Sequence, residues 1–360
     1  MVETLFDGNP ADHGFVMPAE WQQHACTWIA WPHNRDTWSK NLEAAQFEFI
    51  EFALRIALDE PTVVLIPDED QAEIFTRMIA DRPTNSARNI WTMNVPTNDA
   101  WMRDYGPTFV TDEKRIVAID WQYNAWGGKY PPFDDDQKIV QRCLKDIPPM
   151  VQTFGPVARK VSQLCIEGGA IEIDDNHVLM CTTSCALDAN RNPDWNQLQV
   201  EQELKSCLGA KHVIWLDGRA IAGDDTDGHI DQLARFVPGN KIVIASAEST
   251  DDQHSALQSN LDQLQHAIKN LQLDYELVPL PLPDPIYFGE MRLPASYCNF
   301  YITNHSVIVP QFSQPPADTR ALNIIGDLFP NRKVIGLPSY NLTVGLGSFH
   351  CLSQQQPAIS

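Results

Sequence analysis

Residues 42–66, LEAAQFEFIEFALRIALDEPTVVLI, contain two different hydrophobic patterns in succession. Apolar side chains at positions 42, 45, 49, 52 and 56 recur three or four residues apart, which is typical of one face of an amphipathic helix. After Pro61, the continuous apolar run 62–66 is typical of a buried strand. These residues therefore predict a helix followed by a strand, the basic unit of an α/β protein.

The same succession returns later in the chain. Helical spacing followed by a strand signal is found within 252–278 and 316–337, and pairs of apolar runs separated by turn residues are found within 229–246 and 297–311. The order strand, strand, helix, strand thus recurs about five times, without a visible repeat in the sequence itself. Because no Gly/Ser-rich or highly charged linker interrupts it, residues 1–360 are predicted to form one α/β domain.

The chain is acidic, with 47 Asp and Glu against 26 Lys and Arg and a formal net charge of −21. This charge argues against nucleic acids and anionic membranes as partners, and it favours small cationic ligands. The alternative interpretation is that the acidity serves solubility alone. Since 43% of the residues are hydrophobic, the chain can form a sizeable core. A homo-oligomer is compatible with these features.

The eight cysteines are scattered and show neither a disulfide framework nor a zinc-binding spacing. Residues 1–8 contain neither a basic nor an apolar segment, and no apolar run reaches the roughly 20 residues that span a bilayer. We therefore expect a reduced, cytoplasmic protein without a metal. The phosphate-binding loops GxGxxG and GxxxxGK[ST] are both missing from the sequence, and we expect no cofactor.

Cys351 ends the run GLGSFHC at 345–351. Glycines and a small residue before a cysteine allow close approach of the backbone and leave few side chains to shield the sulfur. This pattern makes Cys351 a candidate nucleophile. The alternative is a small, buried hydrophobic residue, which is the commoner state of a free cysteine.

Asp104 lies in the segment WMRDYGP at 101–107, where a tight turn is expected. A carboxylate accepts two parallel hydrogen bonds from a planar guanidinium, and the indole of Trp101 can cover the cation from above. This segment is therefore a candidate cation site. The alternative is a structural turn in which Asp104 pairs with Arg103.

His229 and Asp231 are one residue apart, so on a strand both would point to the same face. Glu167, before two glycines, is the candidate to orient His229, because a carboxylate at one ring nitrogen fixes the tautomer. The alternative for Glu167 is a turn residue. A calcium loop over 223–234 fails, because neither its first nor its last position carries a carboxylate. A metallohydrolase stays an alternative, although no HExxH motif is present.

Together these motifs resemble those of the agmatine deiminase family, in the guanidine-modifying (amidinotransferase-like) superfamily that includes the Porphyromonas-type peptidylarginine deiminases. The resemblance covers nearly the whole chain, and several long motifs occur in the family's order. The matching residues are 17–21, 24, 27–28, 31–32, 99, 101–107, 167–169, 190–193, 225–231, 295–297, 299–301, 345–347, 350–351 and 354–357.

The resemblance implies a five-bladed, pseudo-symmetric α/β propeller of ββαβ modules around a central active site. It also implies metal-free hydrolysis of agmatine to N-carbamoylputrescine and ammonia through an S-amidino-cysteine. Carried over by motif, Cys351 is the nucleophile, His229 the acid and base, Glu167 the partner of His229, and Asp104 and Asp231 the clamp on the guanidinium.

The resemblance further implies that Trp101 and Gly347 border the substrate and that Asp225 binds its amine end. Asp225 precedes Asp231 by six residues, and the alternative is that it only caps a loop. Two residues depart from the family pattern: Leu346 replaces a usual glycine, and Ser348 stands where asparagine is frequent. The alternative functions are deimination of free or peptidyl arginine, or cation binding without catalysis.

Overall fold

The computed structural model describes residues 4–80, 82, 85–145 and 157–359. The helix and strand predicted within 42–66 are confirmed as α1 (Leu42–Ile56) and β2 (Thr62–Ile66). All five residues of β2 are buried, as expected for a parallel strand that is covered on both faces. β2 pairs in parallel with β1 (His24–Ala30).

Five sheets in the described part of the chain share one pattern: two antiparallel strands, then a third strand parallel to the second. A long connection joins the parallel strands, because such strands cannot be joined by a hairpin. In sheet order, the strands are β18 (Ser353–Pro357), β1, β2 and β3 (Ile90–Asn94); β4 (Thr108–Thr111), β5 (Ile116–Gln122) and β6 (Val157–Cys165); β7 (Ile171–Ile173), β8 (Val178–Thr182) and β9 (His212–Leu216); β10 (Ala234–Val237), β11 (Lys241–Ser246) and β12 (Glu276–Pro281); and β15 (Tyr301–Ile302), β16 (Ser306–Gln311) and β17 (Lys333–Pro338). β13 (Tyr287–Phe288) and β14 (Met291–Arg292) form a separate hairpin.

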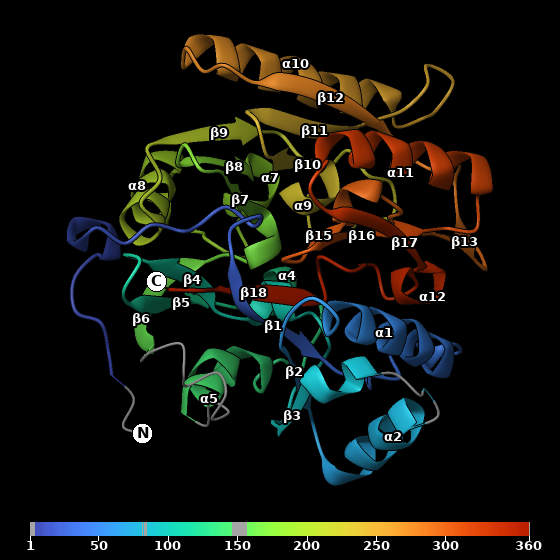
Figure 1. The fold of residues 1–360 in the computed structure, drawn as a ribbon. Coiled ribbons are helices and arrows are strands. Elements are labelled where there is room, and N and C mark those ends of the chain that lie inside the picture. Colours follow the sequence, from blue (N-terminus) through green and yellow to red (C-terminus); the bar gives the residue numbers. More distant parts are fainter. Residues whose placement is uncertain (1–3, 81, 83–84, 146–156, 360) are drawn as a thin grey trace.

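The longer helices lie around the outside of the molecule and the sheets lie inside them (Figure 1). The helices predicted within 252–270 and 316–329 are confirmed as α10 (His254–Asn270) and α11 (Pro315–Leu328), and the mixed α/β class is confirmed with them. No helix in the described ranges is long and apolar enough to span a membrane. Besides α1, the outer helices are α2 (Glu69–Ala80), α5 (Ile139–Lys145), α8 (Gln197–Leu208), α10 (His254–Asn270) and α11 (Pro315–Leu328).

Besides these elements, the described part of the chain contains short helical turns. Several of them carry the polar residues that the sequence motifs single out. They are α3 (Met102–Tyr105), α4 (Ala125–Gly128), α7 (Thr183–Ala186), α9 (Ile230–Leu233) and α12 (Tyr340–Thr343), with 3₁₀ turns at Pro10–His13, Asn85–Asn89, Asp136–Lys138, Gly168–Ala170 and Tyr297–Asn299.

The last strand of the chain pairs with the first strand of the first sheet. β18 runs antiparallel to β1, with Thr27 opposite Gln355. Because Cys351 lies two residues before β18, this pairing also fixes the candidate nucleophile beside the N-terminal sheet. Figure 1 shows β18 crossing the interior of the molecule close to β1 and β4.

The expectation that His229 and Asp231 share a strand is wrong. His229 is the residue before α9, Asp231 lies inside that one-turn helix, and the strand β10 begins only at Ala234. Gly228 has φ +97°, a left-handed conformation that turns the chain into the helix start. The spacing of the two polar residues fits a helix start as well as a strand, so it could not distinguish them.

Two glycines provide a test of this backbone geometry. Gly209 ends α8 with φ +71°, and a Cβ there would lie 2.7 Å from the carbonyl oxygen of Phe15. Gly326 lies inside α11, where a Cβ would meet nothing within 4 Å. Gly209→Ala should lower the free energy of unfolding by about 2 kcal/mol or more. The control Gly326→Ala should raise it by about 0.5–1 kcal/mol. Urea unfolding measures both, and shifts of the same sign would contradict this geometry.

Candidate active site

Asp104 lies in α3 and is 4% exposed. Its Oδ1 accepts a hydrogen bond from the backbone N–H of Gly169 (3.1 Å), and its Oδ2 accepts one from Nε1 of Trp126 (3.0 Å). Both donors are neutral. Burial, reinforced by the negative charges of Asp231 and Glu167 and opposed by His229, raises the pKa of Asp104 to about 6. Asp104 is therefore a buried carboxylate that a bound cation would stabilise in its charged form.

Trp126, the hydrogen-bond donor to Asp104, was not identified from the sequence. It lies in α4, where Ala125 (φ 53°) and Trp126 (φ 56°) both adopt left-handed backbone conformations. Each such residue costs of order 1 kcal/mol or more, and strained backbone of this kind is concentrated at functional sites. The side chain of Asn124 stabilises the turn by accepting a hydrogen bond from the backbone N–H of Gly127 (2.9 Å).

His229 is buried between two carboxylates. Its Nε2 lies 3.3 Å from Oε2 of Glu167, and its Nδ1 lies 3.6 Å from Oδ1 of Asp104. Nδ1 has no hydrogen-bond partner among the residues that the structure describes. Burial would lower the pKa of His229, but Asp104, with further contributions from Cys185 and Glu167, raises this pKa well above its ordinary value. His229 is thus placed to carry a proton beside Asp104.

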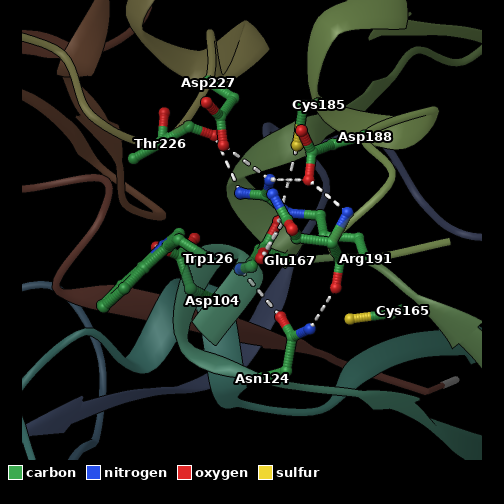
Figure 2. A network of polar contacts seen from close by, with 12 residues as sticks. Asp104, Asn124, Trp126, Cys165, Glu167, Cys185, Asp188, Arg191, Thr226 and Asp227 are labelled. Atoms are coloured by element: carbon green, nitrogen blue, oxygen red, sulfur yellow. Dashed lines mark hydrogen bonds and ion pairs between the residues drawn. The ribbon is translucent and has the colours of Figure 1, made fainter. Parts of the chain in front are cut away.

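Glu167 is held by Arg191, whose role was not predicted although its segment 190–193 matched the family pattern. Nε of Arg191 lies 2.9 Å from Oε1 and 3.1 Å from Oε2 of Glu167. Nη1 of Arg191 binds Asp227 (2.8 Å), and its Nη2 donates to the carbonyl of Thr226 (2.9 Å), as Figure 2 shows. Burial opposes the ionisation of Glu167, but the charges of Arg191 and His229 and their hydrogen bonds lower its pKa to about 2. Glu167 is therefore a permanently charged partner for His229.

Cys351 is only 5% exposed, so the expectation of an unshielded sulfur is wrong. Nδ2 of Asn299 donates a hydrogen bond to Sγ of Cys351 (3.1 Å), and the thiol donates to Oδ2 of Asp231 (3.5 Å). Burial, together with the charges of Asp231 and Asp104, raises the pKa of Cys351 well above its ordinary value. The sequence placed Asn299 in a matching segment but did not predict its contact with the sulfur.

Gly347 makes room between Trp101 and Cys351. A Cβ at Gly347 would lie 2.4 Å from Cζ3 of Trp101 and 3.0 Å from Cβ of Cys351. The indole of Trp101 also packs against Trp38, with ring centroids 5.4 Å apart. Leu346, which replaces the glycine usual in the family pattern, has φ +74°. It therefore adopts the left-handed backbone conformation for which a glycine is suited.

Asp231 is held by His350, the residue before the cysteine. Nδ1 of His350 lies 2.8 Å from Oδ2 of Asp231, and its Nε2 lies 3.0 Å from Oε2 of Glu20, which also pairs with Arg235. Burial opposes the ionisation of Asp231, but the hydrogen bond and charge of His350 lower its pKa. Oδ1 of Asp231 is buried and has no hydrogen-bond partner in the described part of the chain. One oxygen of Asp231 is thereby left for a ligand.

The polar side chains converge on Gly169. A Cβ there would lie 2.7 Å from Oδ1 of Asp104, 2.7 Å from Nδ1 of His229 and 3.1 Å from Oδ2 of Asp231. Since Glu167 contacts His229 and Cys351 contacts Asp231, the structure brings all five predicted catalytic residues into one cluster.

Asp225 lies outside this cluster, on the half-buried loop before α9. Its carboxylate accepts a hydrogen bond from the hydroxyl of Tyr130, and its backbone carbonyl accepts one from Lys129. The ring of Tyr130 packs edge-on against Trp126, with centroids 5.8 Å apart. Asp225 is therefore linked to Asp104 indirectly, through Tyr130 and Trp126.

Comparison with known proteins extends the sequence resemblance over the whole chain. The family model described as Porphyromonas-type peptidyl-arginine deiminase matches residues 16–357. The agmatine deiminase of Medicago truncatula is 32% identical over 382 residues, which cover 98% of this chain and 99% of that protein.

Solved structures agree with this result. The agmatine deiminase of Enterococcus faecalis is 27% identical, with a TM-score of 0.86 and coverage of 100% of both chains. A cysteine-to-serine variant of the C. jejuni agmatine deiminase, with substrate bound, is 29% identical, with a TM-score of 0.84 and coverage of 96% of this chain and 97% of that one. This chain therefore belongs to the Porphyromonas-type peptidyl-arginine deiminase family.

Proposed function

We propose that this protein hydrolyses agmatine to N-carbamoylputrescine and ammonia through a covalent intermediate on Cys351. The observation that carries the proposal is the convergence of Asp104, His229 and Asp231 on Gly169, with the thiol of Cys351 3.5 Å from Asp231. Similarity over the full length to proteins named agmatine deiminase supports the choice of substrate.

The charge of the cluster favours a guanidinium as ligand. Asp104 is bound by two neutral donors, and Asp231 keeps one oxygen without a partner among the described residues. A planar guanidinium can donate to both carboxylates, and its positive charge adds to that of His229, which lies 3.6 Å from Asp104 and is shared with Glu167. Agmatine thus compensates the charge of the site as well as filling it.

The same cation activates the nucleophile. The carboxylates of Asp231 and Asp104 disfavour the thiolate of Cys351 in the empty site. A bound guanidinium offsets these charges, so the thiol loses its proton more readily beside its target. The thiolate is then formed chiefly when substrate is present.

In the proposed reaction, the thiol proton of Cys351 leaves to solvent as the guanidinium binds, and Sγ then bonds to the guanidinium carbon. The bond from that carbon to a terminal nitrogen breaks. His229 gives its proton to this nitrogen, which leaves as ammonia. His229 then removes a proton from water, whose oxygen bonds to the carbon of the S-amidino intermediate. Cleavage of the carbon–sulfur bond releases N-carbamoylputrescine, and the remaining hydroxyl proton of the adduct passes to the departing sulfur and restores the thiol of Cys351. Glu167 orients His229 through both steps.

The finer architecture is also part of the proposal: residues 1–360 form one catalytic domain in which the five sheets are the blades of a pseudo-symmetric propeller. The common strand pattern, the outer position of the helices in Figure 1 and the pairing of β18 with β1 support this arrangement. We place the protein in the cytoplasm, which the eight free, buried cysteines support.

Ammonia release from agmatine, free arginine and a blocked arginine peptide, measured side by side, tests the proposed function. Agmatine should be the preferred substrate by at least tenfold in kcat/KM. Cys351→Ser should lose several orders of magnitude in kcat, because a serine hydroxyl is far harder to ionise than a thiol. Cys143→Ser, a change at another buried cysteine, is the matched control. Preference for either arginine substrate, or near-normal turnover by Cys351→Ser, would overturn the proposal.

We propose that Asp225 selects the amine end of agmatine, because its carboxylate attracts an ammonium and repels the carboxylate of arginine. Asp225→Asn should raise KM for agmatine about ten- to a hundredfold, the equivalent of about 1.5–3 kcal/mol, with a smaller effect on kcat. Asp252→Asn is the control, since that side chain is 72% exposed and pairs with Arg292. An unchanged KM for Asp225→Asn would contradict this role and would show that Asp225 only caps a loop.

We propose that His350 is a positioning residue that fixes the guanidinium-binding oxygen of Asp231. The side-chain amide of His350→Asn can replace the donor at Nδ1, whereas that of His350→Gln reaches toward Nε2 and Glu20. His350→Gln should therefore lose about ten- to a hundredfold in kcat/KM, and His350→Asn should recover most of it. Far-ultraviolet circular dichroism checks folding of both variants. Equal losses in the two would contradict positioning through Nδ1.

A further inference from the structure

A second group of potential ligands lies behind His229, on the side of its ring away from Asp104. Oε2 of Glu167 lies 3.3 Å from Nε2 of His229 and 3.5 Å from Sγ of Cys185, and all three atoms lie within 4.8 Å of one another. All three residues are buried, and Figure 2 shows Cys185 above Glu167 and beside Arg191. The proposed reaction uses Glu167 and His229 but leaves Cys185 without a role.

These separations match the edges of a zinc coordination tetrahedron. With zinc bonds of about 2.0–2.3 Å to oxygen, nitrogen and sulfur, neighbouring ligand atoms lie about 3.3–3.6 Å apart. The two contacts to Oε2 of Glu167 already have these lengths, before any side chain moves. A thiolate, an imidazole and a carboxylate are also a ligand set that zinc accepts, with the fourth position open.

A comparable cluster of Glu20, Glu172 and His350 is a poorer candidate. There Arg235 pairs with both carboxylates, so their charges are already compensated. In the cluster behind His229, Arg191 forms an ion pair with one of the three ligands, Glu167, and its charge also acts on Cys185. The thiol of Cys185 is a ligand type that the other cluster lacks.

We propose that Glu167, Cys185 and His229 form an inhibitory site for Zn²⁺ or a similar borderline-soft divalent cation. Binding releases the thiol proton of Cys185 and occupies Nε2 of His229 and Oε2 of Glu167. With a metal ion on Nε2, the ring of His229 cannot hold the second proton that it must give to the leaving nitrogen, so the metal-bound protein is inactive. Because the ligands are buried behind His229, inhibition should develop slowly and should not be relieved by saturating agmatine.

The binding test uses Co²⁺ on metal-free protein, since a cobalt–thiolate bond gives a near-ultraviolet charge-transfer band. Wild type, Cys351→Ser and Cys181→Ser should all show the band with one equivalent of metal, whereas Cys185→Ser should lack it. Cys181 is the matched control because it is a buried cysteine four residues away on the same strand-to-helix segment. Loss of the band in Cys351→Ser, or its retention in Cys185→Ser, would overturn the site.

The inhibition test rests on the proposed function, whereas the cobalt test does not, so the two can fail separately. Each protein is incubated with Zn²⁺, and its agmatine turnover is divided by its own rate without the metal. Cys185→Ser should need at least tenfold more Zn²⁺ than wild type or Cys181→Ser for half inhibition, and EDTA should restore the wild-type rate. Equal sensitivity of all three proteins would show that inhibition arises elsewhere, for instance at Cys351, and would contradict the proposal.

Discussion

The fully buried ion pair between Arg191 and Glu167 holds one carboxylate of the catalytic cluster in place. Burying carboxylates together is costly unless each has a compensating charge and well-placed hydrogen bonds. Arg191 provides this charge for Glu167, and Nδ1 of His350 lies within hydrogen-bonding distance of Oδ2 of Asp231 (2.8 Å). The third carboxylate of the cluster, Asp104, has neutral donors and a histidine 3.6 Å away, and its pKa is raised accordingly.

The charge of Asp104, which shares His229 with Glu167, connects the architecture with the proposed chemistry. A site in which carboxylates outnumber the cationic side chains beside them binds a guanidinium and, for the same reason, disfavours a thiolate until that guanidinium is bound. The same electrostatic interaction then drives both the binding of the guanidinium and the deprotonation of Cys351. The same excess of carboxylates, with Cys185 close by, also makes the region behind His229 a candidate for a soft metal ion.

Much of this arrangement could be predicted from the sequence. The helical spacing within 42–56 and 252–270 determined the elements correctly, because burial of one helix face leaves a clear periodicity. The five candidate catalytic residues were found because each stands next to glycine or in a long motif. Asp231 was placed on a strand instead of a helix, since the spacing of two residues cannot distinguish a one-turn helix from a strand.

The supporting residues could not be derived in this way. Trp126 reaches Asp104 from a left-handed loop, which is an unusual backbone conformation for non-glycine residues and has no simple sequence signal. Arg191, Asn299 and His350 act through contacts with residues 24 to 119 positions away in the chain. Burial of Cys351 likewise depends on packing between distant segments, which flanking glycines do not reveal.

The central claim is that Cys351 attacks the guanidinium carbon within a carboxylate cluster, and rapid acid quenching during turnover of agmatine tests it most directly. Mass spectrometry of the digested protein should locate an amidino adduct on Cys351, and the other seven cysteines should be unmodified. The adduct should form and decay at rates compatible with kcat. An adduct on a different cysteine, or full turnover with no adduct on Cys351 at any quench time, would contradict the account.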